Sequence, residues 1–183
     1  AKIVELEAIR GLAALLVLFY HIPPWNYIGD LRIFDNGYLM VHLFFVLSGF
    51  VIFSSYGERI VSGVDLLRFQ FLRFGRLYPI HVLFLLLFLL LEVAKYVAQT
   101  GFGLPSTTSL PFEDNNLRSF LYNALLIHAV IPYEQLTFNR PSWSISVEFY
   151  TYLVFGLIAL TAHRAKLWIF ALITVASFLL LEL

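Results

Sequence analysis

Long apolar runs separated by short polar connections divide this chain into six segments. An α-helix needs about 17–25 mostly apolar residues to cross the hydrocarbon core of a bilayer. The runs lack the strict alternation that is typical of lipid-facing barrel strands. The segments are Ile9–Ile22, Leu39–Ser55, Ile80–Ala98, Leu117–Ile131, Trp143–Ala162 and Leu167–Leu183. The pattern predicts an all-α fold, a polytopic transmembrane helical bundle with about five to six membrane segments in one domain, residues 1–183.

The fourth apolar segment, Leu117–Ile131, is the least regular of the six. It is short, and the polar residues Asn123 and His128 interrupt it. Two alternatives follow from this pattern: the segment crosses the membrane, or it is re-entrant or interfacial.

Basic residues in short connections predict the orientation, because cytoplasmic loops carry an excess of Lys and Arg. The connection 56–79 contains four arginines, Arg59, Arg68, Arg73 and Arg76. We therefore expect this loop and the N-terminus to be cytoplasmic. Six full crossings would place Arg164 and Lys166 on the outer side, against the same rule. That conflict disappears if Leu117–Ile131 does not cross.

Composition agrees with a membrane protein and excludes several kinds of function. Hydrophobic residues make up 60% of the chain and charged residues 13%, against about 45–50% and about 25% in soluble domains. The formal net charge is zero, so no overall field favours a nucleic acid. Cysteine is absent, which excludes disulfides and thiolate metal sites. The histidines lack the spacing of a metal pair, and we predict no metal site and no bound cofactor.

Arg10 and His21 lie at the two ends of the first apolar run, eleven positions apart. Eleven helical steps return to within about 20° of the starting direction and advance about 16 Å. Both side chains therefore lie on one stripe of the predicted helix. His21 is suited to general-base chemistry, since its unperturbed pKa lies near neutrality. The alternative is that Arg10 extends to the headgroups and His21 marks the outer interface.

Two further groups of polar residues are candidates for a site. Arg73 and Arg76 are three apart, and paired guanidinium groups bind phosphates well. The alternative for them is a basic flank that contacts anionic lipid. Ser144 and Glu148 share a helix face at the start of the fifth segment, and an ionisable group in the membrane is a functional candidate. Glu92 and Lys95, also three apart, are expected to form a local ion pair.

Four blocks of the sequence together resemble the N-terminal half of acyltransferase family 3, the membrane family that includes bacterial O-antigen and exopolysaccharide O-acetylases. The first, Leu6–His21, contains the family's Arg-x10-His signature. The second is Val41–Phe50, and the third, Arg73–Pro79, contains the Arg-x-x-Arg pair. The fourth is Pro141–Tyr150. All four occur in the family's order and spacing.

The resemblance implies a larger enzyme with roughly ten spanning helices, of which this chain would hold about half and lack the C-terminal helices. Its activity would be transfer of an acyl group, commonly acetyl, from cytoplasmic acetyl-CoA or another acyl-CoA. The acceptor would be a hydroxyl of a cell-surface carbohydrate or lipid on the far side of the cell membrane. The expected partners are the lipid bilayer, the acyl-CoA and this acceptor, with no nucleic acid.

On this interpretation His21 acts as the general base, and Arg10 orients the site or the donor. Glu148 fixes the His tautomer or pairs with Arg10, while Trp143 and Ser144 are supporting residues. Arg73 and Arg76 bind the donor phosphates. The alternative function is a membrane transporter or flippase for a polar substrate, since carriers also need polar residues within the membrane.

Overall fold

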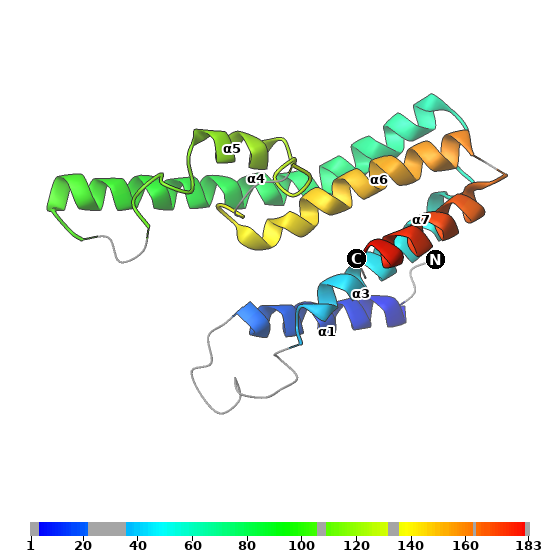
Figure 1. Cartoon of the computed structure of the whole chain (residues 1–183), viewed down its shortest axis with the longest axis horizontal. Coiled ribbons are helices and arrows are strands. Elements are labelled where there is room, and N and C mark those ends of the chain that lie inside the picture. Colours follow the sequence, from blue (N-terminus) through cyan, green and yellow to red (C-terminus); the bar gives the residue numbers. More distant parts are fainter. Residues whose placement is uncertain (1–3, 22–35, 106–108, 132–135, 163, 182–183) are drawn as a thin grey trace. The chain divides into compact units, whose positions relative to one another are not determined.

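A computed structural model describes residues 4–21, 36–105, 109–131, 136–162 and 164–181 of the chain (Figure 1). These residues form six α-helices and one short 3₁₀ helix, and no strand occurs in the described ranges. This confirms the all-α prediction. The chain divides into two compact units, residues 1–59 and residues 60–183.

The first unit is built from two apolar helices that pack against each other, α1 (Val4–His21) and α3 (Leu39–Tyr56). Ala13 of α1 is buried, as are Leu47 and Ile52 of α3. Both helices agree with segments predicted from the apolar runs, since an apolar run of this length without an internal proline favours a continuous helix. α1 begins five residues earlier than the predicted segment, so Arg10 lies inside the helix and not near its first residue.

The second unit contains a 40-residue helix, α4 (Gly63–Phe102). Ser62 and Asp65 form a reciprocal capping box at its start: the Asp65 amide donates to the Ser62 hydroxyl and the Ser62 amide donates to the Asp65 carboxylate. At its end Gly103 has a φ of 63°, and its amide donates to the Gln99 carbonyl. Only glycine adopts this left-handed conformation freely. Both ends of α4 are therefore encoded locally.

The length of α4 corrects the prediction that residues 56–79 form a loop, because α4 begins at Gly63, while the cytoplasmic placement of these residues stays a prediction. At about 1.5 Å per residue the helix is about 60 Å long, roughly twice the hydrocarbon thickness. Arginine is a good helix former, so the basic stretch continues the helix instead of interrupting it. Pro79 lies inside the helix. Figure 1 shows α4 changing direction within its length, as expected of a helix that contains a proline.

The remaining elements of the second unit are α5 (Leu117–Ala124), η1 (Arg140–Ser142), α6 (Trp143–Thr161) and α7 (Lys166–Leu181). The eight residues of α5 extend about 12 Å, less than half of the hydrocarbon thickness. α5 is thus too short to cross. Of the two alternatives left open for Leu117–Ile131, the structure favours the segment that does not span the membrane.

α6 packs along the N-terminal part of α4. The Phe69 ring of α4 lies 6.2 Å from the Tyr152 ring and 5.8 Å from the Phe155 ring, between ring centroids. Gly156 is the position of closest approach, because a Cβ there would lie 3.5 Å from the Phe69 ring and would overlap the Leu66 side chain. α7 in turn contacts α6 through a stacked pair of rings. Aromatic packing around one glycine therefore joins α4 and α6.

Among the residues that the structure describes, three helical stretches are long and apolar enough to cross a membrane, namely Leu39–Tyr56, Gly63–Phe102 and Arg140–Thr161. Ala8–His21 and Lys166–Leu180 are shorter apolar helices. Large apolar side chains such as Phe71 and Trp168 are mostly exposed, as expected of surfaces that lipid covers. The helices are those of a multi-pass membrane protein.

Candidate functional site

Arg10 and His21, the pair predicted from the first apolar run, lie on one uninterrupted helix, α1. Arg10 is half-buried, and His21 is exposed in the last turn. The continuous helix gives the pair the spacing expected from sequence, about 16 Å along one stripe. α1 therefore separates a guanidinium from an imidazole by about half the thickness of the hydrocarbon core.

The His21 ring is oriented by its own helix. Its Nδ1 lies 2.8 Å from the Val17 carbonyl oxygen. A carbonyl can only accept a hydrogen bond, so Nδ1 carries the proton and Nε2 of the neutral ring carries the lone pair. The Tyr20 ring stands edge-on to the imidazole at 5.1 Å between centroids. Nε2 is thus the nitrogen suited to accept a proton, because the hydrogen bond to the helix backbone is made by Nδ1.

Arg73 and Arg76, the predicted phosphate-binding pair, both lie on α4 but in different surroundings. The Arg73 guanidinium is half-buried, 5.6 Å from the Phe69 ring centroid and 5.9 Å from that of Tyr152. These distances are those of cation–π contacts. The Arg76 side chain is exposed. Arg73 is therefore held by aromatic packing between α4 and α6, whereas Arg76 is accessible.

Glu148 accepts a hydrogen bond from the Tyr152 hydroxyl, one turn further along α6. The Tyr152 ring also contacts the Arg73 guanidinium, so Tyr152 contacts both Glu148 and Arg73. Tyr152 was not among the predicted site residues, although the four-residue spacing of Glu and Tyr on one helix was a usable signal. Trp143 begins α6, and the Ser144 hydroxyl donates to the Pro141 carbonyl at 3.0 Å.

The predicted site residues fall in both units. Arg10 and His21 belong to the first, and Glu148 belongs to the second. The proposed contact of Glu148 with His21 or Arg10 therefore stays a prediction. Ser144 lies one turn before Glu148 on α6, at the four-residue spacing expected from the sequence, and Trp143 is the first residue of that helix.

Side chains from α4 and α6 bind the backbone of the last two residues of α5 and of the turn that follows it. The Tyr78 hydroxyl donates to the Ala124 carbonyl at 3.0 Å, and His81 Nε2 donates to the Asn123 carbonyl at 2.9 Å. From α6, the Ser146 hydroxyl donates to the Leu126 carbonyl. Carbonyls at a helix end have no partner within the helix. These three side chains supply partners for a turn buried between two long helices.

Two histidines meet at this turn. The His81 and His128 rings are parallel to within 4°, with centroids 5.7 Å apart. His128 Nε2 lies 3.3 Å from the Ser142 hydroxyl at the start of α6. Burial lowers the pKa of His128, because desolvation disfavours the charged imidazolium. Sequence alone placed these histidines at the ends of separate segments, and only the tertiary fold brings them together.

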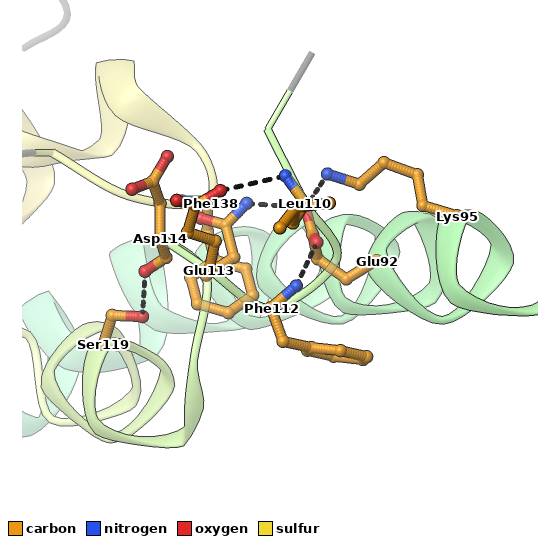
Figure 2. Close-up of polar contacts among 9 residues, drawn as sticks. Glu92, Lys95, Leu110, Phe112, Glu113, Asp114, Ser119 and Phe138 are labelled. Carbon is orange, nitrogen blue, oxygen red and sulfur yellow. Dashed lines mark hydrogen bonds and ion pairs between the residues drawn. The ribbon is translucent and has the colours of Figure 1, made fainter. Parts of the chain in front are cut away.

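A second polar cluster surrounds Glu92 in the C-terminal half of α4 (Figure 2). Its carboxylate accepts from Lys95 Nζ at 2.6 Å, from the Phe112 amide at 3.0 Å and from Asn115 Nδ2 at 2.7 Å. The Asn115 side chain also accepts from the Phe138 amide at 2.6 Å. The expected Glu92–Lys95 ion pair is confirmed. The Glu92 carboxylate also anchors the segment with Phe112 and Asn115 to α4, and Asn115 in turn holds the Phe138 amide, which was not predicted.

Two residues of this cluster have a left-handed backbone that is unfavourable for side chains other than glycine. The φ angles are 61° at Phe112 and 54° at Phe138. Such conformations persist where surrounding contacts hold them. Here the amide of each residue donates to a side chain of the cluster, Glu92 in one case and Asn115 in the other. The cluster is therefore a structural anchor.

Comparison with known proteins identifies one family over nearly the whole chain. A family model described as an acyltransferase domain matches residues 3–183. No solved structure matches the chain significantly.

Two curated relatives are similar to this chain over part of their length. Protein 2 in the picA locus of Rhizobium radiobacter is 39% identical over 115 residues, which cover 62% of this chain and 53% of that protein. Acyltransferase MdmB of Streptomyces mycarofaciens is 31% identical over 168 residues, which cover 85% of this chain and 40% of that protein. The chain thus spans about half or less of the length of these relatives.

Proposed function

Because this chain belongs to acyltransferase family 3, we propose that it takes part in moving an acyl group, acetyl in the first instance, from acyl-CoA to a hydroxyl group. The acceptor is a carbohydrate or lipid at the cell surface. One observation carries the assignment of the chemistry: His21 is exposed at the end of α1, and its Nδ1 donates to the Val17 carbonyl. A neutral imidazole held in this way presents Nε2 as a base.

In the proposed step, His21 Nε2 takes the proton of the acceptor hydroxyl while the hydroxyl oxygen attacks the thioester carbonyl. The tetrahedral intermediate collapses, the carbon–sulfur bond breaks, and the departing thiolate receives the proton back from His21. The products are the ester and the free thiol. Direct transfer needs no covalent enzyme intermediate, which agrees with a chain that contains no cysteine.

Arg10 and Glu148 have proposed roles around this base. Arg10, on the same stripe of α1, orients the site or the donor through its guanidinium. Glu148 is proposed to fix the His21 tautomer or to pair with Arg10. The Val17 carbonyl already accepts from His21 Nδ1 and Tyr152 already donates to Glu148.

Arg73 and Arg76 are proposed to bind the phosphates of the donor on the cytoplasmic side. Four arginines between residues 56 and 79 favour that orientation by the positive-inside rule. A planar guanidinium matches phosphate oxygens bidentately. The exposed Arg76 is available for such a contact, while the Arg73 guanidinium packs against the rings of Phe69 and Tyr152.

The test of the catalytic role uses the full-length protein in membranes. Acetyl-CoA consumption is followed as released thiol, and ester formation on the acceptor is followed separately. His21→Ala is expected to lower kcat by about 10²–10⁴-fold, the usual contribution of a general base. His42→Ala, at an exposed histidine of α3, is the matched control. Activity of the His21 variant near that of the control contradicts the proposal.

The donor site is tested by titrating acetyl-CoA against Arg73→Ala and Arg76→Ala. A raised KM with kcat retained is expected, because phosphate binding lies far from the reacting carbonyl. An unchanged KM in both variants argues against phosphate binding. The alternative of a transporter is distinguished by the thiol assay, since a carrier moves its substrate without consuming a thioester.

A further inference from the structure

Tyr152 is a buried tyrosine of α6 that contacts two of the predicted site residues. It is 5% exposed. Its hydroxyl donates to the Glu148 carboxylate, and its ring centroid lies 5.9 Å from the guanidinium carbon of Arg73. The proposed transfer step does not use Tyr152, so the reason for these two contacts has to be found elsewhere in the site.

Arg73 and two aromatic rings form a small triangle. The guanidinium carbon is 5.6 Å from the Phe69 ring centroid and 5.9 Å from that of Tyr152, and the two rings are 6.2 Å apart. A guanidinium within about 6 Å of an aromatic ring is attracted by the electrons of the ring face. Phe69 lies one turn before Arg73 on α4. Of these two contacts, the one with Tyr152 therefore fixes the guanidinium relative to α6.

The close approach of α4 and α6 holds the Tyr152 ring in place. Gly156 lies one turn after Tyr152 on α6, and a Cβ there would overlap the Leu66 side chain of α4. Phe69, which is 1% exposed, packs against the rings of both Tyr152 and Phe155. Side chains in such close packing keep one rotamer on the time average. The ring is thus a fixed support for the guanidinium.

Packing alone does not explain the Tyr152 hydroxyl. Contact with Phe69 needs only an aromatic ring, which phenylalanine also supplies. The hydroxyl bonds to Glu148, one turn earlier on the same helix, so this bond does not join α6 to α4. It fixes the orientation of the ring from within α6. Donation to a carboxylate also makes the ring richer in electrons, which strengthens its attraction for a cation.

A guanidinium that is already held in place binds an anion at lower cost. An arginine side chain is long and has many rotamers. Ordering one such side chain during binding weakens the affinity for a ligand by about 2–10-fold. Where aromatic rings hold the guanidinium before the ligand arrives, the folded protein has already met that cost.

We propose that Tyr152 is a positioning residue of the donor site, and that its ring holds the Arg73 guanidinium in the orientation that binds a phosphate of the acyl-CoA. The inference rests on the proposed donor role of Arg73 and adds the residue that prepares it. Tyr152 acts through Arg73 and does not itself contact the donor.

The test measures equilibrium binding of CoA to the full-length protein in lipid nanodiscs, together with kcat and the KM for acetyl-CoA. Tyr152→Leu removes the ring and is expected to raise Kd and KM about 2–10-fold with kcat retained. Tyr152→Phe keeps the ring and is expected to bind CoA within about twofold of the parent. Phe155→Leu, which removes another ring that packs on Phe69, is the matched packing control and is expected to leave Kd unchanged.

A further replacement keeps the shape of the ring, so that a folding defect does not obscure the result. Trifluorophenylalanine in place of Tyr152 has a ring face that is poor in electrons. It is expected to raise the Kd for CoA about twofold or more above that of Tyr152→Phe, because the cation–π attraction is weakened. Equal Kd values in these two proteins overturn the role of the ring.

Arg73→Ala tests the proposed function, and a double variant tests the inference. If Arg73→Ala leaves the Kd for CoA unchanged, the donor role of Arg73 is wrong, and this inference falls with it. If Arg73→Ala raises Kd, adding Tyr152→Leu is expected to cause no further loss, because the ring then has no guanidinium to hold. Losses that multiply in the double variant, an unchanged Kd in Tyr152→Leu, or an equal loss in Phe155→Leu overturn the role of Tyr152 alone.

Discussion

Glu92 offers the sharpest test of how the second unit is held together, because its carboxylate is buried and every described donor to it is known. Glu92→Leu removes the charge while keeping a side chain that suits the apolar part of α4. The substitution leaves the Phe112 amide, Asn115 Nδ2 and Lys95 Nζ without their shared acceptor. We expect the unfolding free energy to fall through loss of these contacts.

The expected magnitude follows from burial. Hydrogen bonds to a charged group contribute about 1.5–3 kcal/mol each, and Phe112 and Asn115 supply two of them. The Lys95 side chain is 32% exposed, against 5% for Glu92, so its ion pair adds about 1 kcal/mol or less. Removing one partner of a buried cluster typically costs about 3–5 kcal/mol. We therefore expect a loss of about 4 kcal/mol in Glu92→Leu.

Two further variants separate the contributions of the hydrogen bonds and of the ion pair to this loss of unfolding free energy. Glu92→Gln retains one carbonyl acceptor and is expected to lose about 2 kcal/mol. Lys95→Met keeps the carboxylate and both neutral donors, and is expected to lose about 1 kcal/mol at most. The assay is reversible unfolding of the purified protein in mixed micelles containing dodecyl sulfate. Limited proteolysis between residues 109 and 116 reports on local release of the anchored segment.

The order of the three variants is the critical result. Glu92→Leu must be the least stable and Lys95→Met the most stable of them. If Glu92→Leu unfolds within about 0.5 kcal/mol of the parent, as an ordinary surface substitution does, the anchoring role of Glu92 is refuted. A loss in Lys95→Met equal to that in Glu92→Leu shows instead that the ion pair carries the stability.

Three other substitutions test the packing and capping of α4. Gly156→Val is expected to cost about 1–3 kcal/mol in thermal unfolding, because the valine side chain would overlap Leu66. Gly101→Val serves as the control, since a Cβ at that position meets no atom closer than 3.9 Å. Ser62→Ala removes the hydroxyl of the capping box and is expected to cost about 1 kcal/mol; unchanged unfolding argues against the cap. Tyr78→Phe removes one hydrogen bond to the last residue of α5 and is expected to cost about 1 kcal/mol. Backbone amide exchange at the end of α5 measures this loss, and unchanged protection there contradicts the contact.

The helices with clear apolar runs were predictable because helix formation is a local property of the sequence. α3 and α6 agree with the predicted segments to within about a residue at each end. The sequence also indicated that Leu117–Ile131 was irregular. It did not indicate that α4 continues through the basic stretch, because arginine is compatible with both a loop and a helix, and charge alone does not distinguish them.

Contacts between segments that are distant in the sequence were not predictable in this way. The sequence by itself determined the membrane class, the family blocks, the Arg10–His21 stripe and the Glu92–Lys95 pair, since each depends on composition or on spacing within one helix. Only the tertiary structure decided that Glu92 accepts from Phe112, twenty residues away, and that His81 stacks on His128. Such contacts depend on how helices and connections pack, which spacing along one helix does not specify.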